Sequence, residues 1–141
     1  MAKSKKNLEF TFERTIPALP EEVYDAWLNP EVKGNHWNVA KKLLFNPKVD
    51  GLYYIGVEGF PHYGRFTKLK RPSIIEHTWV SPNTMGLETN VTVTFKKQGA
   101  GALMTLVHRD LPNTEEAKGH EEGSNYFLDI FPGQFKASRK K

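Results

Sequence analysis

The chain has 141 residues, with 20 basic and 16 acidic side chains, five histidines and no cysteine. This length suits one domain with a substantial core, and the missing cysteine excludes disulfides, thiolate metal sites and a thiol nucleophile. Seven of the 20 basic residues lie in residues 1–6 and 136–141. The segment between them, residues 7–135, therefore has 13 basic and 16 acidic residues. We expect one domain over residues 1–141, with a core at about 8–135, flexible basic tails and no specific nucleic-acid site.

The sequence also bears on location and assembly. No apolar run approaches 18 residues, and no signal peptide precedes the first expected strand. These patterns predict a cytoplasmic protein without membrane association. We expect a monomer or a weak dimer.

The first expected element is a strand over residues 8–16, where apolar and polar residues alternate strictly. Pro20 follows and is typical of the first position of a helix. An apolar stripe at helical spacing then predicts a short helix, formed by Val23, Ala26 and Trp27. This helix ends before Asn29, and a second short helix is expected near residues 30–35.

From residue 39 the apolar period becomes two, which predicts six further strands. They are expected over residues 40–45, 52–57, 63–69, 74–80, 88–97 and 102–109. Turn-forming sequences separate them, among them Asp50-Gly51, Gly59-Phe60-Pro61 and Gln98-Gly99-Ala100-Gly101. Short turns between successive strands indicate an antiparallel meander, and hence an α+β fold with seven strands.

A long helix is predicted over residues 113–131, with Asn113 as its N-cap and Pro132 ending it. The residues expected on its inward side recur at spacings of three and four, and they are Ala117, His120, Ser124, Phe127 and Phe131. Gly119 and Gly123 lie one turn apart inside the helix, and each costs about 1 kcal/mol relative to alanine. We expect the helix to cover the sheet, and the two glycines to leave room for a cavity there.

Several segments share, in the same order, the sequence pattern of a known superfamily. The opening reads Arg14-Thr15-Ile16-Pro17-Ala18, followed by Pro20-Glu21-Glu22-Val23-Tyr24-Asp25-Ala26-Trp27. Later matches are Trp37, Asp50-Gly51 and residues 64–69, 74–79, 91–95, 104–108 and 120–123. Over roughly residues 8–131 the chain resembles the SRPBCC superfamily (START-like, Bet v-like), and within it the activator of heat-shock-protein-90 ATPase homologue-like family. The resemblance implies a helix-grip fold: a curved antiparallel seven-stranded sheet wrapped around a long C-terminal helix, with two short helices after the first strand.

Members of the family include ligand binders, cyclase-like enzymes and chaperone-associated domains, so the fold alone does not fix the function. We expect a domain that binds a small, largely apolar molecule between sheet and helix, without a cofactor. The alternatives are a cyclase- or hydrolase-like enzyme that uses a cavity histidine, and a chaperone-associated interaction module. Relatives usually carry a tryptophan directly after the helix glycine, whereas this chain has Ser124. We therefore expect the cavity beside Ser124.

The alternation of side chains along the strands, their spacing along the helix and the resemblance together predict which side chains surround the cavity. The candidates are Trp37, Tyr53, Phe66, His77, Trp79, Met104, Leu106, His108, His120, Ser124 and Phe127. Each inward histidine is a satisfied buried residue, a polar anchor for a ligand, or an acid/base or metal group. No pair of histidines has metal-ligand spacing, so no metal is expected. The segment Phe60-Pro61-His62-Tyr63 is expected in a turn, where it would form a lip at the cavity mouth.

Overall fold

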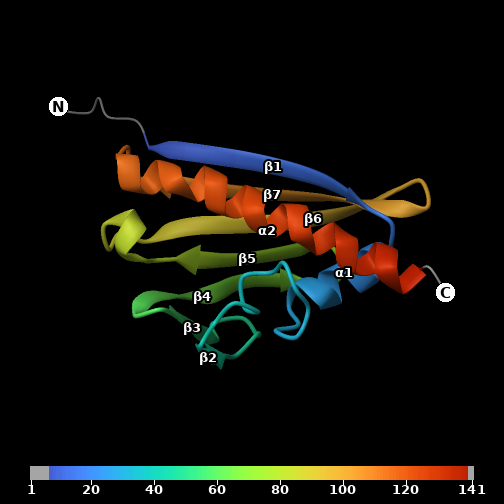
Figure 1. Cartoon of the computed structure of the whole chain (residues 1–141), viewed down its shortest axis with the longest axis horizontal. Coiled ribbons are helices and arrows are strands. Elements are labelled where there is room, and N and C mark those ends of the chain that lie inside the picture. Colours follow the sequence, from blue (N-terminus) through green and yellow to red (C-terminus); the bar gives the residue numbers. More distant parts are fainter. Residues whose placement is uncertain (1–6, 140–141) are drawn as a thin grey trace.

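The computed structural model describes residues 7–139, in which a curved sheet packs against one long helix (Figure 1). The strands are β1 (Leu8–Ile16), β2 (Lys42–Phe45), β3 (Leu52–Val57), β4 (Phe60–Lys70), β5 (Ile74–Trp79), β6 (Thr89–Gln98) and β7 (Gly101–Leu111). The helices are α1 (Pro20–Trp27), the single turn η1 (Pro82–Thr84) and α2 (Glu115–Arg139). The α+β helix-grip fold is confirmed. Of the predicted tails, residues 1–6 and 140–141 lie outside the described residues, whereas residues 136–139 continue α2.

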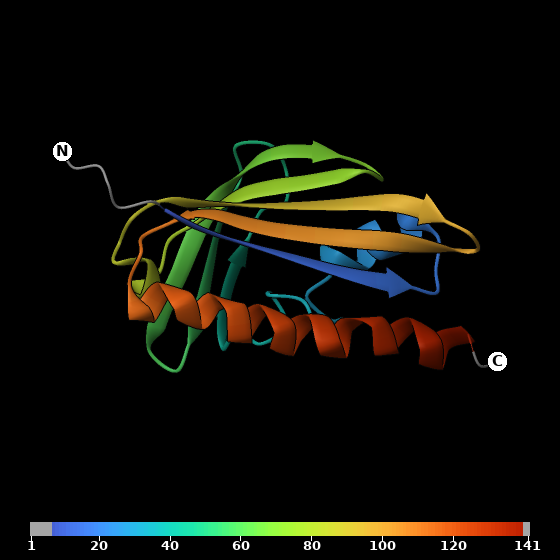
Figure 2. The ribbon, with the colours of Figure 1, turned by 90° about the horizontal axis from the view of Figure 1, so that it is seen from above.

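The seven strands form one antiparallel sheet in the order β1-β7-β6-β5-β4-β3-β2. Figure 2 shows α2 running along the concave side, with β2, β3 and β4 turned toward the N-terminal half of the helix. The sheet therefore grips α2 on two sides at that end. This is where a hollow between sheet and helix can form.

The core lies on the inner face of the sheet. Its completely buried large side chains include Ile16, Trp27, Trp37, Ile55, Phe66, Ile75, Met104, Leu106, Leu128 and Phe131. Within it, Trp37 packs against Tyr53 and Phe66, with ring centroids 5.0 and 5.8 Å away. This aromatic cluster fills the space beneath the strongly bent strands β3, β4 and β5.

Helix α2 starts and ends later than predicted. Thr114, rather than Asn113, caps it, because the Ala117 N–H donates to Thr114 Oγ1 at 3.0 Å. The helix also continues through Pro132, which lacks an N–H and so loses one backbone hydrogen bond. Phe131, just before this proline, is completely buried, and its ring packs edge-on against that of Phe135, with centroids 5.2 Å apart. This packing keeps the segments before and after Pro132 in one helix.

The predicted second short helix at residues 30–35 is wrong, because this segment forms a series of turns. Asn35 is completely buried, and its amide donates to the carbonyls of Ala26 and Asn29 at 2.9 and 2.8 Å. Gly34 has a φ of +95° and lies against the backbone of Phe131, where a Cβ would clash. These tertiary contacts replace a local helix and fix the position of His36, two residues after Gly34.

The hairpin between β3 and β4 is tighter than predicted. Only Glu58 and Gly59 form the turn, with φ values of 49° and 85°, which suits a two-residue type I′ hairpin. Val57 then pairs with Phe60, so Phe60-Pro61-His62-Tyr63 starts β4 instead of lying in a turn. Alternation along this strand places His62 on the inner face and Tyr63 on the outer one.

Candidate functional site

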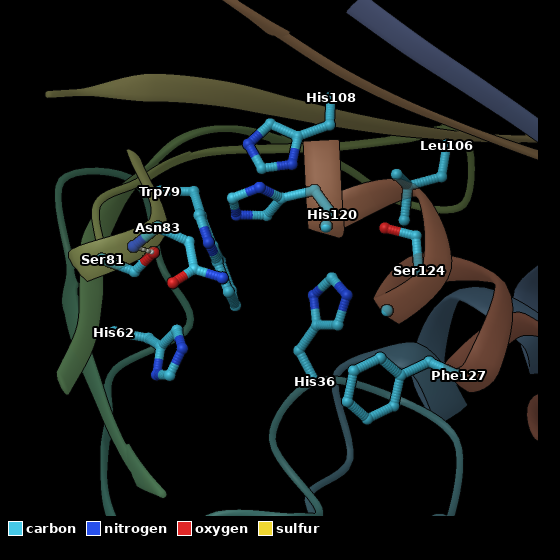
Figure 3. Close-up of a pocket in the computed structure, with 12 residues that line it drawn as sticks. His36, His62, Trp79, Ser81, Asn83, Leu106, His108, His120, Ser124 and Phe127 are labelled. Atoms are coloured by element: carbon cyan, nitrogen blue, oxygen red, sulfur yellow. Dashed lines mark hydrogen bonds between the residues drawn. The ribbon is translucent and has the colours of Figure 1, made fainter. Parts of the chain in front are cut away.

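A cavity of about 170 Å³ lies between the sheet and the N-terminal half of α2, and we call it the polar chamber. Figure 3 shows its side chains converging from the sheet, the η1 turn, the 30–39 segment and α2. It is lined by His36, His62, Trp79, Ser81, Asn83, Leu106, His108, Gly119, His120, Gly123, Ser124 and Phe127.

A second hollow of about 260 Å³ adjoins the first, and we call it the apolar chamber. Its lining is His36, Val39, Ile55, Val57, His62, Trp79 and Phe127. Four of these residues line the polar chamber as well, namely His36, His62, Trp79 and Phe127. The site thus has a histidine-rich part and a hydrocarbon part that share one wall, an arrangement that suits a molecule with one polar and one apolar end.

The structure brings together six of the eleven predicted cavity residues. Trp79, Leu106, His108, His120, Ser124 and Phe127 line the polar chamber. The other five lie in the core and line neither chamber, and they are Trp37, Tyr53, Phe66, His77 and Met104. Parity assigns a side chain to the inner face, but it does not tell whether that side chain lies beneath the core or beside a hollow.

Sequence reasoning left four polar lining residues out of the candidate set: His36, His62, Ser81 and Asn83. His36 belongs to an irregular segment without a periodic pattern, and Ser81 and Asn83 belong to the η1 region. His62 lay within the segment predicted as a lip, which was a usable signal for it. Gly119 and Gly123, which were predicted to leave room, are both part of the lining.

The two helix glycines face open space. A Cβ built on Gly123 meets no atom within 4 Å, and one built on Gly119 meets only Asn83 Nδ2, at 4.0 Å. By contrast, a Cβ on Gly64 would lie 2.4 Å from the Thr78 carbonyl oxygen. Close packing therefore explains Gly64 but neither helix glycine, and the space beside those two belongs to the polar chamber.

No side chain that lines either chamber is an aspartate, glutamate, lysine or arginine. The histidines are neutral at physiological pH. Burial, and to a lesser extent the neighbouring histidines, lowers the pKa of His36 to about 3 and that of His108 to about 2. Burial also lowers the pKa of His62 and His120. The site therefore offers hydrogen-bonding groups without a formal charge.

His36 stands at the boundary between the chambers. Figure 3 shows its ring pointing into the space between Trp79, His120 and Ser124. The ring packs edge-on against Phe127, with centroids 5.2 Å apart, and lies 5.0 Å from the Trp79 ring. Its Nδ1 is buried and has no hydrogen-bond partner among residues 7–139. Such unpaired buried nitrogens are rare in folded proteins and call for a partner.

Two further features concern the described residues 7–139. No group of three or more histidine, cysteine, aspartate or glutamate side chains is arranged there to hold a metal ion. None of the helices in this range is long and apolar enough to span a membrane.

Comparison with known proteins finds a matching family and solved structures of similar fold. The family model described as activator of Hsp90 ATPase homolog 1-like protein matches residues 17–135. A crystal structure of a Mesorhizobium loti protein is similar with a TM-score of 0.75 and 18% identity, over 92% of this chain and 98% of that one. For a Chromobacterium violaceum protein the values are 0.71 and 24%, over 89% and 94%. The Aha1 dimer of Colwellia psychrerythraea gives 0.71 and 14%, over 90% and 96%. No curated protein matches the chain.

Proposed function

The chain belongs to the activator of Hsp90 ATPase homolog 1-like family, and on that premise we propose that it binds a small, largely apolar molecule between its sheet and helix α2. At the level of the family, the fold is that of a ligand-binding domain. The finer proposal concerns the place: the ligand occupies the polar and apolar chambers together. The polar end lies among the histidines, and the hydrocarbon part lies against Val39, Ile55 and Val57.

The observation that carries this proposal is the pair of glycines in α2. Each destabilises the helix by about 1 kcal/mol relative to alanine, and no neighbouring atom in the described residues requires the absence of a Cβ at either position. Their side of the helix is one wall of the polar chamber. A ligand that approaches the helix backbone closely would account for both glycines.

Alanine at these two positions tests the proposal. We expect Gly119→Ala and Gly123→Ala each to raise the free energy of unfolding by up to about 1 kcal/mol, because helix propensity improves without a clash. The same variants should weaken binding of the apolar fluorophore N-phenyl-1-naphthylamine severalfold, because each methyl group occupies the chamber. Urea unfolding and a fluorescence titration measure the two effects.

Gly133→Ala is the matched control. Gly133 lies in the same helix, a Cβ there also meets nothing within 4 Å, and it lines neither chamber. It should stabilise the helix by a similar amount and leave probe affinity unchanged. If Gly119→Ala and Gly123→Ala bind the probe as well as Gly133→Ala does, the ligand does not lie along this face of α2.

The enzyme alternative fits the histidines less well. A cyclase- or hydrolase-like reaction requires a proton-transferring group whose pKa lies near the working pH. His36 and His108, with pKa values of about 3 and 2, do not titrate near neutrality, and burial lowers the pKa of His62 and His120 below its ordinary value as well. We therefore propose binding rather than catalysis.

A second candidate function, binding of a protein partner, is favoured by an apolar patch on the outer face of β2, β3 and β4. Its most exposed members, Leu44, Leu52 and Tyr63, are 59%, 67% and 46% exposed and surround a hollow of about 270 Å³ with Tyr54. Strand register places Tyr54 directly between Leu44 and Tyr63. Exposed apolar groups gathered in this way mark interaction surfaces, and the family description suggests an Hsp90-type chaperone as the partner.

Leu52→Lys separates this candidate from the first. If the patch binds a chaperone, the variant should lower affinity for an Hsp90 protein about tenfold or more, as for a central apolar contact, and leave N-phenyl-1-naphthylamine binding unchanged. Tyr126→Lys, at a 63% exposed position on α2, is the control and should alter neither. Equal chaperone affinity of wild type and Leu52→Lys, measured by surface plasmon resonance, would exclude this role for the patch.

A further inference from the structure

Hydrogen bonds fix which nitrogen carries the proton in two histidines of the polar chamber. His120 Nδ1 lies 2.8 Å from the Ala117 carbonyl oxygen, and His62 Nδ1 lies 3.4 Å from that of Ile55. A carbonyl oxygen only accepts, so Nδ1 must carry the N–H in both rings. In a neutral imidazole the other nitrogen then bears a lone pair. Nε2 of His120 and Nε2 of His62 are therefore acceptors.

In His108 one nitrogen is also left as an acceptor, and two linked hydrogen bonds determine which one. Thr89 Oγ1 donates its only proton to the Trp79 carbonyl oxygen at 2.6 Å. His108 Nε2 lies 2.8 Å from the same hydroxyl oxygen, so the histidine must be the donor in that pair. The lone pair of His108 is thus on Nδ1. Three of the four histidines in the lining use their N–H inside the protein and can only accept from a ligand.

His36 adds a group that needs a partner of either kind. Its Nδ1 is buried and has no hydrogen-bond partner within residues 7–139, while the residue as a whole is 7% exposed. A hydroxyl group satisfies this nitrogen in either tautomer, because it both donates and accepts. A carbonyl or ether oxygen could accept from Trp79 Nε1, whose buried N–H has no partner among the described residues, but it would leave the lone pairs of the other three histidines unmatched.

A charged ligand would find no counter-charge here. The lining of both chambers holds no basic or acidic side chain other than the neutral histidines. A carboxylate or phosphate moved into this site would lose its hydration without gaining an ion pair, which is costly. Hydrogen-bond complementarity and charge thus favour the same kind of molecule.

We propose that the ligand is an uncharged alcohol or phenol whose hydroxyl group binds beside His36 and donates to the histidine lone pairs of the polar chamber, while its hydrocarbon part fills the apolar chamber. This proposal rests on the proposed function and specifies its ligand class. The position of His36, in the wall shared by the two chambers, places the hydroxyl where the polar and apolar parts of the ligand meet.

A matched series of naphthalene probes tests the proposal on the wild-type protein. The probes are 1-naphthol, 1-methoxynaphthalene, naphthalene and 1-naphthoate, compared by isothermal titration calorimetry at pH 7.5. We expect 1-naphthol to bind about tenfold more tightly than 1-methoxynaphthalene, since only the hydroxyl donates a hydrogen bond. Naphthalene should bind at least as weakly as the ether, and 1-naphthoate should bind most weakly of the four.

His36→Phe keeps an aromatic ring at the boundary and removes its nitrogens. We expect this variant to bind 1-naphthol and 1-methoxynaphthalene with nearly equal affinity, because the nitrogen that pairs with the hydroxyl group is gone. If the variant does not fold, the wild-type series decides alone, and equal affinity for 1-naphthol and 1-methoxynaphthalene overturns the hydroxyl proposal. That result leaves the proposed function standing, whereas failure of all four probes to bind overturns both.

Discussion

Ser124→Trp is expected to abolish binding of N-phenyl-1-naphthylamine while keeping or raising the melting temperature. Ser124 is 8% exposed and lines the polar chamber beside Gly123. Inserting a large side chain into a packed core ordinarily costs about 1–3 kcal/mol, but here the indole enters a cavity of about 170 Å³ that adjoins a second one. Filling it should gain apolar contacts and remove the ligand's space.

The matched control for this variant is Tyr126→Trp, two residues along the same helix at a 63% exposed position. It adds an indole outside the chambers and should leave probe affinity and melting temperature unchanged. Thermal melting followed by circular dichroism and a probe titration measure both variants. A clearly destabilised Ser124→Trp variant that still binds the probe would mean that Ser124 lies in a close-packed seam.

Acid should destabilise the protein well above the pH at which carboxylates titrate. In the folded chain the pKa is about 3 for His36, about 4 for His77 and about 2 for His108, each lowered mainly by burial, against an ordinary value of 6.5. Below pH 6.5 the unfolded chain therefore binds protons that the folded chain does not, so stability falls as the pH falls. Between pH 7 and pH 5 each histidine removes about 2 kcal/mol of unfolding free energy, or about 6 kcal/mol for the three.

The pKa shifts of His62, His120 and Asp25 do not oppose this trend. Burial lowers the pKa of His62 and His120 too, so their effect has the same sign. A hydrogen bond from Arg71 lowers the pKa of Asp25, so the contribution of that carboxylate is lost as the pH falls from the ordinary aspartate pKa downwards, which is below pH 5. Histidines thus govern stability between pH 5 and pH 7.

Urea unfolding at pH 7, 6 and 5 measures this dependence. A loss of about 6 kcal/mol is comparable to the whole stability of a typical domain, so the protein should be largely unfolded near pH 5. His36→Phe should reduce the loss by about one third, because one of the three buried imidazoles is gone. Constant stability over this range would show that the folded protein accepts protons at these histidines without strain.

Much of the fold could be predicted because its signals are local. The expected strands at residues 8–16 and 52–57 coincide with β1 and β3, since strict alternation and turn residues act over a few positions. The failures arose from distant contacts. Asn35 ties the 30–39 segment to Ala26 and Asn29 in place of a helix, and the packing around Phe131 carries α2 through Pro132.

The candidate site could be predicted only in part for a related reason. The glycine pair and Ser124 predicted a hollow from the helix sequence alone, because a glycine inside a helix is unusual and can be recognised locally. His77 and His108 share the inner face, yet His77 is completely buried against Tyr53 whereas His108 lines the polar chamber. Depth below the sheet surface depends on how strongly the sheet curves, which no spacing in the sequence records. His36 depends on the turns around Asn35 in the same way.

The placement of the tryptophans makes the protein its own optical reporter. The chain has three of them, and Trp27 and Trp37, which are 0% and 1% exposed in the core, line neither chamber. Trp79 alone forms a wall of the two chambers, with the imidazoles of His36 and His62 5.0 and 5.4 Å from its ring. Its emission therefore depends directly on what fills the space beside it, whereas the other two indoles reach that space only indirectly, through neighbours such as His36. Occupancy of the site can be followed by intrinsic fluorescence, without a label and with ligands that have no colour.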